Sequence, residues 1–81
     1  MSIKKEKISG RIIDLDLKSS SLKSASYDML TEKLTVTFNS GSSYAYYKVP
    51  VLDFTKFKLA KSQGVYLNTH IVPNYNFRKV K

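Results

Sequence analysis

The stretch Gly41–Pro50 constrains the fold of this chain most, because it predicts a strand that leaves a tight turn and runs directly into a helix. The preceding stretch, Lys33–Phe38, alternates along the chain and is rich in β-branched and aromatic residues, which is typical of a strand. Between the two, Asn39-Ser40-Gly41 favours a three-residue hairpin loop with Gly41 in the left-handed conformation. Val49-Pro50 ends the second strand, since proline suits the first turn of a helix.

The length of this loop decides which tyrosines face the core. With three residues in the loop, Val36 lies opposite Tyr44. Leu34 then lies opposite Tyr46, and Tyr47 points outward. A two-residue Ser-Gly turn would shift the register by one residue and exchange the two faces. We predict the three-residue loop, with Tyr44 and Tyr46 between sheet and helix and their hydroxyls bonded to polar partners.

Other segments indicate further strands. Apolar residues alternate from Arg11 onward, and they place Ile13, Leu15 and Leu17 on one face of a strand. Leu22–Tyr27 is a candidate for a second short extended segment. The remaining candidate lies at the other end of the chain, where the tail alternates aromatic and basic residues and could pair with the sheet edge.

Two helices are predicted after the hairpin. Residues 51–61 form the first, because their apolar positions recur with a helical period. Leu52 and Leu59 lie nearly opposite that apolar side, where either a second element or another subunit could cover them. Ser62 could cap a second, shorter helix over Val65–His70 by accepting from its free N–H groups.

We therefore predict an α+β fold, with a three- to four-stranded antiparallel meander followed by two short helices packed on one face. Residues 11–81 form this single domain, and residues 1–10 form a flexible basic arm. No segment approaches the roughly 20 apolar residues that span a bilayer, and no apolar segment follows the charged N-terminus as in a secretory signal. With no cysteine in the chain, we expect a cytoplasmic protein without membrane contact.

Charge is the strongest compositional feature. Fourteen Lys and Arg residues stand against six Asp and Glu residues, which gives a formal net charge of +8. One interpretation is a surface that only improves solubility. The other is attraction to a polyanion or to a phosphate-bearing ligand.

Several short motifs, taken in order and spacing, resemble the KTSC domain, which is named for its occurrence at the C-terminus of some lysyl-tRNA synthetases and also occurs as small free-standing proteins. The matching positions are Ser19-Ser20, Tyr27-Asp28, Leu34–Phe38 with Gly41, Tyr44-Ala45-Tyr46, Val49-Pro50, Ala60–Gly64, Tyr66–Asn68, Ile71 and Tyr75. They cover roughly residues 17–78. The resemblance implies an RNA-binding appendage. Val72 departs from the family pattern, since a basic residue usually follows the isoleucine.

The chemical inventory predicts no enzyme. The sequence has no cysteine nucleophile, no Gly-rich phosphate loop and no metal-ligand cluster, so no catalytic residue, metal or cofactor is expected. The turn between the helices is a candidate anion pocket. Its members are Ser62, Gly64, Asn68 and His70. Capping and packing are the simpler interpretation of the same residues, because such roles are common in turns between helices.

We expect a non-enzymatic module that binds phosphate-bearing ligands, with RNA as the favoured nucleic acid. The candidate contacts combine exposed aromatic rings with cations, and they are Tyr47, Lys48, Lys56, Lys58, Lys61, Tyr75, Phe77, Arg78, Lys79 and Lys81. Two alternatives stay open. One is a small phage or bacterial protein that captures an anionic nucleotide-like signalling molecule in a compact pocket. The other is a protein-interaction module that uses Leu52 and Leu59, for which a homodimer is one candidate assembly.

Overall fold

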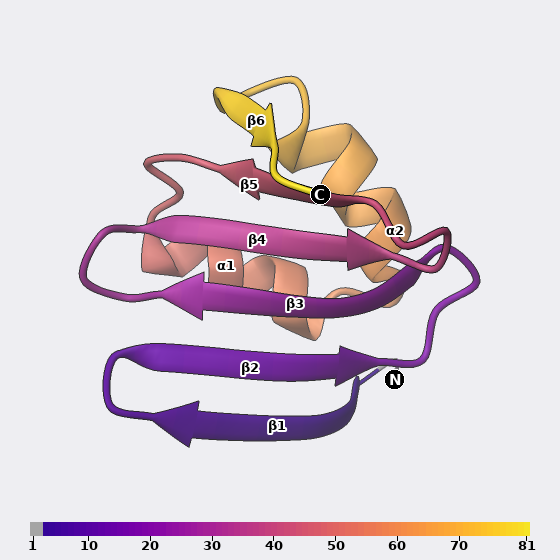
Figure 1. Cartoon of the computed structure of the whole chain (residues 1–81), viewed down its shortest axis with the longest axis horizontal. Helices are drawn as coiled ribbons and strands as arrows, with labels where there is room; N and C mark the ends of the chain where they lie inside the picture. The colour runs from indigo at the N-terminus through magenta and orange to yellow at the C-terminus, as the bar shows by residue number, and fades with distance from the viewer. Residues whose placement is uncertain (1–2) are drawn as a thin grey trace.

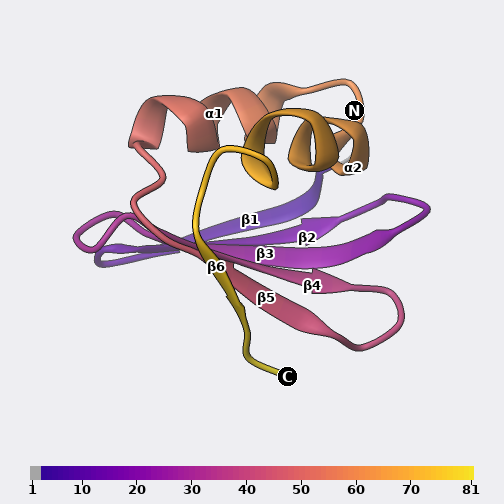
Figure 2. The same ribbon diagram turned by 90° about the horizontal axis from the view of Figure 1, so that it is seen from above.

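The computed structural model describes residues 3–81, which form a sheet layer and a helix layer (Figure 1). The sheet has six antiparallel strands whose spatial order follows the chain. The strands are β1 (Ile3–Ser9), β2 (Ile12–Leu17), β3 (Leu22–Asp28), β4 (Lys33–Phe38), β5 (Ser43–Tyr46) and β6 (Phe77–Lys79). The second layer holds α1 (Val51–Leu59), α2 (Gln63–Tyr66) and the π-helical turn η1 (Leu67–Ile71). Figure 2 shows both helices on one side of the sheet, as the sequence predicted.

The predicted hairpin register is confirmed. Val36 pairs with Tyr44 and Leu34 pairs with Tyr46 across β4 and β5. Gly41 has a φ of 99°, and its N–H donates to the Phe38 carbonyl at 2.9 Å. This loop geometry turns both tyrosine rings toward the helix layer, where Tyr46 is almost fully buried.

Tyr27 is the centre of the core between the two layers. Its ring stacks on Phe54 of α1, with ring centroids 4.3 Å apart and planes within 5°. Its hydroxyl donates to the Val49 carbonyl at 2.6 Å, so one side chain joins β3 to the start of α1. Burial, together with the negative charges of Glu32 and Asp28, raises the pKa of this hydroxyl.

The prediction that the hydroxyls of Tyr44 and Tyr46 bond to polar partners is not confirmed. Among residues 3–81, the structure gives the hydroxyls of Tyr44 and Tyr46 no hydrogen-bond partner. The expected buried tyrosine hydrogen bond is instead the one made by Tyr27. Tyr27 lies in a central strand, where its hydroxyl reaches the Val49 carbonyl just before α1, whereas β5 is the second strand from the edge of the sheet.

The prediction of three to four strands is wrong by at least two, and both ends of the chain account for this. Ile3–Ser9, expected within a flexible arm, forms β1 and pairs with β2. Met1 and Ser2 lie outside the described residues. Nearly all of β1 and all of β6 is exposed, so neither strand has the alternating burial by which inner strands are recognised. Lysine-rich exposed strands are typical of sheet edges.

The helix boundaries also shift slightly. The first helix ends at Leu59, because Ala60 is extended with a ψ of 149°. Ser62 caps the second helix as predicted, since its hydroxyl accepts from the Val65 N–H at 3.2 Å. No helix among residues 3–81 is long and apolar enough to cross a membrane.

Candidate functional site

A hollow lined by aromatic residues lies at the end of the sheet where β4, β5 and β6 approach η1. It has a volume of about 440 Å³. We call it the aromatic cleft, and its lining residues are Phe38, Ser40, Ser42, Tyr44, Tyr46, Asn68, Val72 and Phe77. Sequence reasoning named only Asn68 and Phe77 of this set as candidate contacts.

The strand pattern places the rings of the cleft. Tyr44 and Tyr46 are two residues apart on β5 and therefore share the helix-facing side of the sheet. Phe77 pairs with Tyr46 in the neighbouring strand, with ring centroids 5.8 Å apart and planes inclined at 40°. Phe38 meets Tyr44 edge to face at 5.8 Å. Burial, followed by the neighbouring Tyr44, raises the pKa of Tyr46.

The cations of the C-terminal strand lie beside these rings. Lys79 pairs with Tyr44 and Arg78 pairs with Ala45. Side chains of directly paired residues point to the same side of a sheet, so Lys79 lies on the side of the cleft and Arg78 on the opposite side. Lys81 follows the strand, and its carbonyl accepts from the Ser43 N–H at 3.0 Å.

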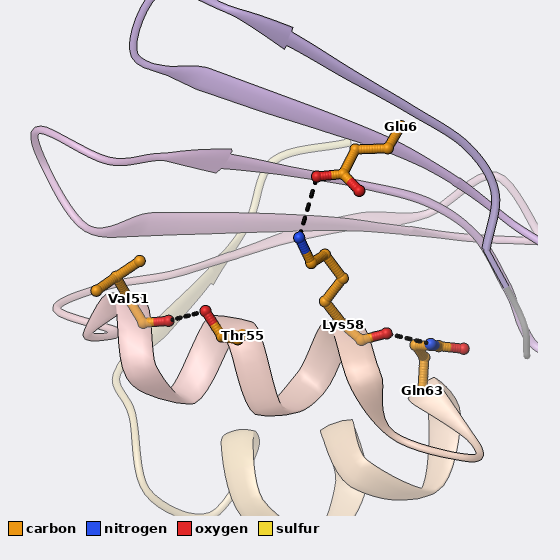
Figure 3. A network of polar contacts seen from close by, with 5 residues as sticks. All are labelled: Glu6, Val51, Thr55, Lys58 and Gln63. Carbon is orange, nitrogen blue, oxygen red and sulfur yellow. Dashed lines mark hydrogen bonds and ion pairs between the residues drawn. The ribbon is translucent and has the colours of Figure 1, made fainter.

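The other predicted cations belong to the helix layer. Lys48 lies in the connection before α1 with a left-handed backbone, at a φ of 59°. Lys56 and Lys61 are exposed on or just after α1. The Lys58 ammonium instead binds the Glu6 carboxylate of β1 at 3.1 Å, as Figure 3 shows. The seven predicted cations are therefore divided between α1 with its flanks and β6.

The three predicted aromatic contacts lie in different surroundings. Tyr47 is partly exposed, and Phe77 is 55% exposed. Tyr75 is half-buried, and its hydroxyl donates to the Asp53 carboxylate of α1. Tyr66 donates to the other oxygen of the same carboxylate at 3.4 Å. Burial, the hydrogen bond to Asp53 and its negative charge raise the pKa of Tyr75 to about 12. Tyr75 therefore anchors the chain before β6.

The four residues of the predicted anion pocket do not share one hollow. Ser62 and His70 line a second pocket of about 290 Å³ beside α2. The His70 ring there packs on Tyr66, with centroids 4.5 Å apart. Asn68 lines the aromatic cleft. Gly64 is buried against the loop before β3, because a Cβ atom at this position would lie 2.7 Å from the Ser21 hydroxyl.

Gln63 is the buried polar residue of the turn between the two helices. Its side-chain amide donates to the carbonyl of Lys58 at 3.0 Å and so closes the end of α1 (Figure 3). Its own Oε1 atom is buried and, among the described residues, has no partner. In the part of the chain that the structure describes, no three His, Cys, Asp or Glu side chains gather as a metal site would require. The turn therefore has the capping and packing contacts that were the simpler interpretation of its sequence.

Comparisons with known proteins match most of the chain. The family model described as the KTSC domain matches residues 18–75. The chain is 36% identical over 59 residues to a lysine–tRNA ligase of Nostoc punctiforme, and this match spans 73% of the chain but 10% of the ligase. It is 32% identical over 59 residues to a small protein of Tsukamurella paurometabola, of which the match spans 88%. The crystal structure of a KTSC domain protein from Yersinia pestis superposes with a TM-score of 0.79 at 27% identity, covering 86% of this chain and 99% of that one.

Proposed function

The chain belongs to the KTSC domain family, and from this premise we propose that it is a non-enzymatic module that binds phosphate-bearing ligands, with RNA as its favoured partner. One relative with this domain is named for a tRNA substrate. The match covers only a tenth of that ligase, so the name supports the class of partner and not a reaction. The net charge of +8 supports the same class, because polyanions attract such a protein at long range.

The main support for the proposal is strand β6. Arg78, Lys79 and Lys81 are exposed within four residues of one another, at an edge of the sheet. The exposed ring of Phe77 precedes them. Cations beside an exposed aromatic ring suit a single strand, because ammonium and guanidinium groups neutralise phosphates while bases stack on the ring.

A salt titration with matched variants tests this proposal. In the β6 variant, Arg78, Lys79 and Lys81 are all replaced by Gln. In the control, Lys4, Lys5 and Lys7 of β1 are replaced by Gln, which removes the same charge from the opposite edge of the sheet. Binding to a short single-stranded RNA is measured between about 50 and 200 mM salt.

We expect the affinity of the unmodified protein to fall with salt. Each neutralised phosphate contributes a slope of about −0.7 for a single strand, so the β6 variant should lose about 2 from the slope of log K against log salt. The β1 variant should keep most of the slope. Salt-independent binding by the unmodified protein, or equal losses in both variants, would contradict the proposed role of β6.

A further inference from the structure

The aromatic cleft has the parts that a single nucleotide requires, and we propose that it binds one unstacked nucleobase with the attached sugar and phosphate. This inference rests on the proposed function and deepens it, because it assigns a base to a defined place beside β6. A cleft of about 440 Å³ lies within the size range of small-molecule sites, roughly 300–1,000 Å³.

The rings of the cleft are arranged so that a base can stack on them. Tyr44 and Phe77 have centroids 6.0 Å apart and planes inclined at 61°, and the other ring pairs are also tilted or edge to face. None of these rings is covered by a parallel ring from the described part of the chain. The exposed ring of Phe77 therefore offers a face for stacking, as bases stack on aromatic side chains in single-strand binding proteins.

Polar groups in the cleft are free to read the edge of a base. Within residues 3–81, no hydrogen bond engages the hydroxyls of Tyr44 and Tyr46 or the side-chain amide of Asn68. Tyr46 is only 3% exposed, so the half-buried Tyr44 and the exposed Asn68 are the polar groups that a base can reach. An amide presents one acceptor and one donor side by side, which is the arrangement that recognises a base edge.

Lys79 is the β6 cation on the same side of the sheet as the cleft, and we assign the phosphate to it. Lys79 pairs with Tyr44 and extends on the same side of the sheet, whereas Arg78 pairs with Ala45 and extends on the other side. The two cations are neighbours in sequence, yet only Lys79 is placed to contact a nucleotide in the cleft. Replacing each of the two cations in turn therefore separates contact with the nucleotide from the effect of net charge.

The second pocket fits a nucleotide less well. Its two rings, Tyr66 and His70, already pack on each other at 4.5 Å, and its volume of about 290 Å³ is smaller. One face of each ring is therefore already occupied by the other ring. We therefore assign the nucleotide to the aromatic cleft alone.

The experiment is an NMR titration of the full chain with the four nucleoside 5′-monophosphates and, separately, with inorganic phosphate. We expect the nucleotides to shift the resonances of Tyr44, Asn68 and Phe77, and inorganic phosphate to leave Asn68 and Phe77 unchanged. Phe77→Ala should weaken nucleotide binding about tenfold, the effect of losing one stacking contact. Val80→Ala, a control with a similarly exposed side chain on the same tail, should have no effect.

The paired charge variants complete the test. Lys79→Gln should weaken nucleotide binding several-fold, and Arg78→Gln should not change it, although both remove one charge. Circular dichroism and thermal unfolding confirm that each variant is folded. The inference is overturned if nucleotides at about 10 mM leave the cleft resonances unshifted, since that excludes even millimolar affinity. It is also overturned if phosphate alone reproduces the nucleotide shifts or if both charge variants bind equally.

A second arm separates a free nucleotide from a nucleotide within a strand. Short single-stranded RNA is titrated against the same variants. Tight RNA binding that depends on β6 charges but not on Phe77 would refute the cleft and leave the proposed function intact. Binding of mononucleotides in the cleft without any RNA binding would retain the cleft and refute RNA as the partner.

Discussion

Replacing Tyr75 with phenylalanine tests whether a tyrosine–carboxylate contact holds β6 in place. Tyr75 lies two residues before β6, and its hydroxyl donates to Asp53 in the first turn of α1. The same carboxylate accepts from Tyr66, so one aspartate ties three segments together. Tyr75→Phe keeps the ring and removes only the hydroxyl. We expect the variant to fold with lower stability and a less firmly held β6.

The size of the effect follows from the pKa of Tyr75, which burial, the hydrogen bond to Asp53 and its charge raise from 10.0 to about 12. A rise of this size corresponds to about 2.7 kcal/mol. Part of that rise is burial, which penalises the ionised phenol without stabilising the neutral one, so at neutral pH the hydroxyl contributes only its hydrogen bond to Asp53, about 1 kcal/mol after solvent screening. The folded state favours the neutral phenol, so this contribution is complete below pH 10. It disappears as the pH rises from 10 to 12.

Thermal and urea unfolding, followed by circular dichroism, measure this contribution. At neutral pH the Tm of Tyr75→Phe should be about 4–8 °C below that of the unmodified protein. The difference should shrink above pH 10, while the ionisation of lysines and the other tyrosines affects both proteins equally. Tyr47→Phe is the matched control, because Tyr47 is exposed and its hydroxyl bonds to no described residue. An equal Tm at neutral pH, or a difference that persists to pH 12, would refute the anchor.

Three further substitutions test the scaffold by urea unfolding. Tyr27→Phe should cost about 1–3 kcal/mol, because the buried Val49 carbonyl loses its donor; no change would mean that water replaces the hydroxyl. Gly41→Ala should cost about 1 kcal/mol, because φ is 99° in the hairpin loop; an unchanged stability would indicate that the loop relaxes. Leu52→Ser with Leu59→Ser should stay within about 0.5 kcal/mol, since both side chains are at least 64% exposed, and a larger loss would reveal a covering contact.

The parts of the fold that the sequence predicts well are those with a buried face. In β2 and β4, apolar residues alternate with polar ones because one side of each strand packs on the helices. The hairpin register follows from the loop, since Asn39 and Gly41 restrict its length and a one-residue shift would expose the core tyrosines. In these elements the turn residues and the pattern of buried side chains predict the same structure, so the sequence is enough to predict it.

The edge strand β1 could not be predicted in the same way, whereas the tail was a candidate for the edge pairing that β6 makes with β5. Almost every residue of β1 is exposed, and backbone pairing with β2 holds the strand, with Ile3 packed against the core at its start. The Glu6–Lys58 ion pair also depends on tertiary structure, because it joins residues that are far apart in the sequence. A lysine-rich segment with little apolar content is therefore compatible both with a flexible arm and with an edge strand, and only the pairing distinguishes the two.

The candidate site depends on the same kind of long-range pairing. Composition indicates a class of ligand, but it cannot place the charge, because Arg78 and Lys79 become different only when β6 pairs with β5. A shift of one residue would bring Arg78 to the cleft and turn Phe77 and Lys79 away from it. The register of the three exposed residues of β6 therefore decides which cation lies on the side of the cleft. In another register the basic tail would be surface charge without a place in the site. Tyr75, which fixes the approach to that register, lies outside the strand, and this is why the anchor and the cleft must be tested separately.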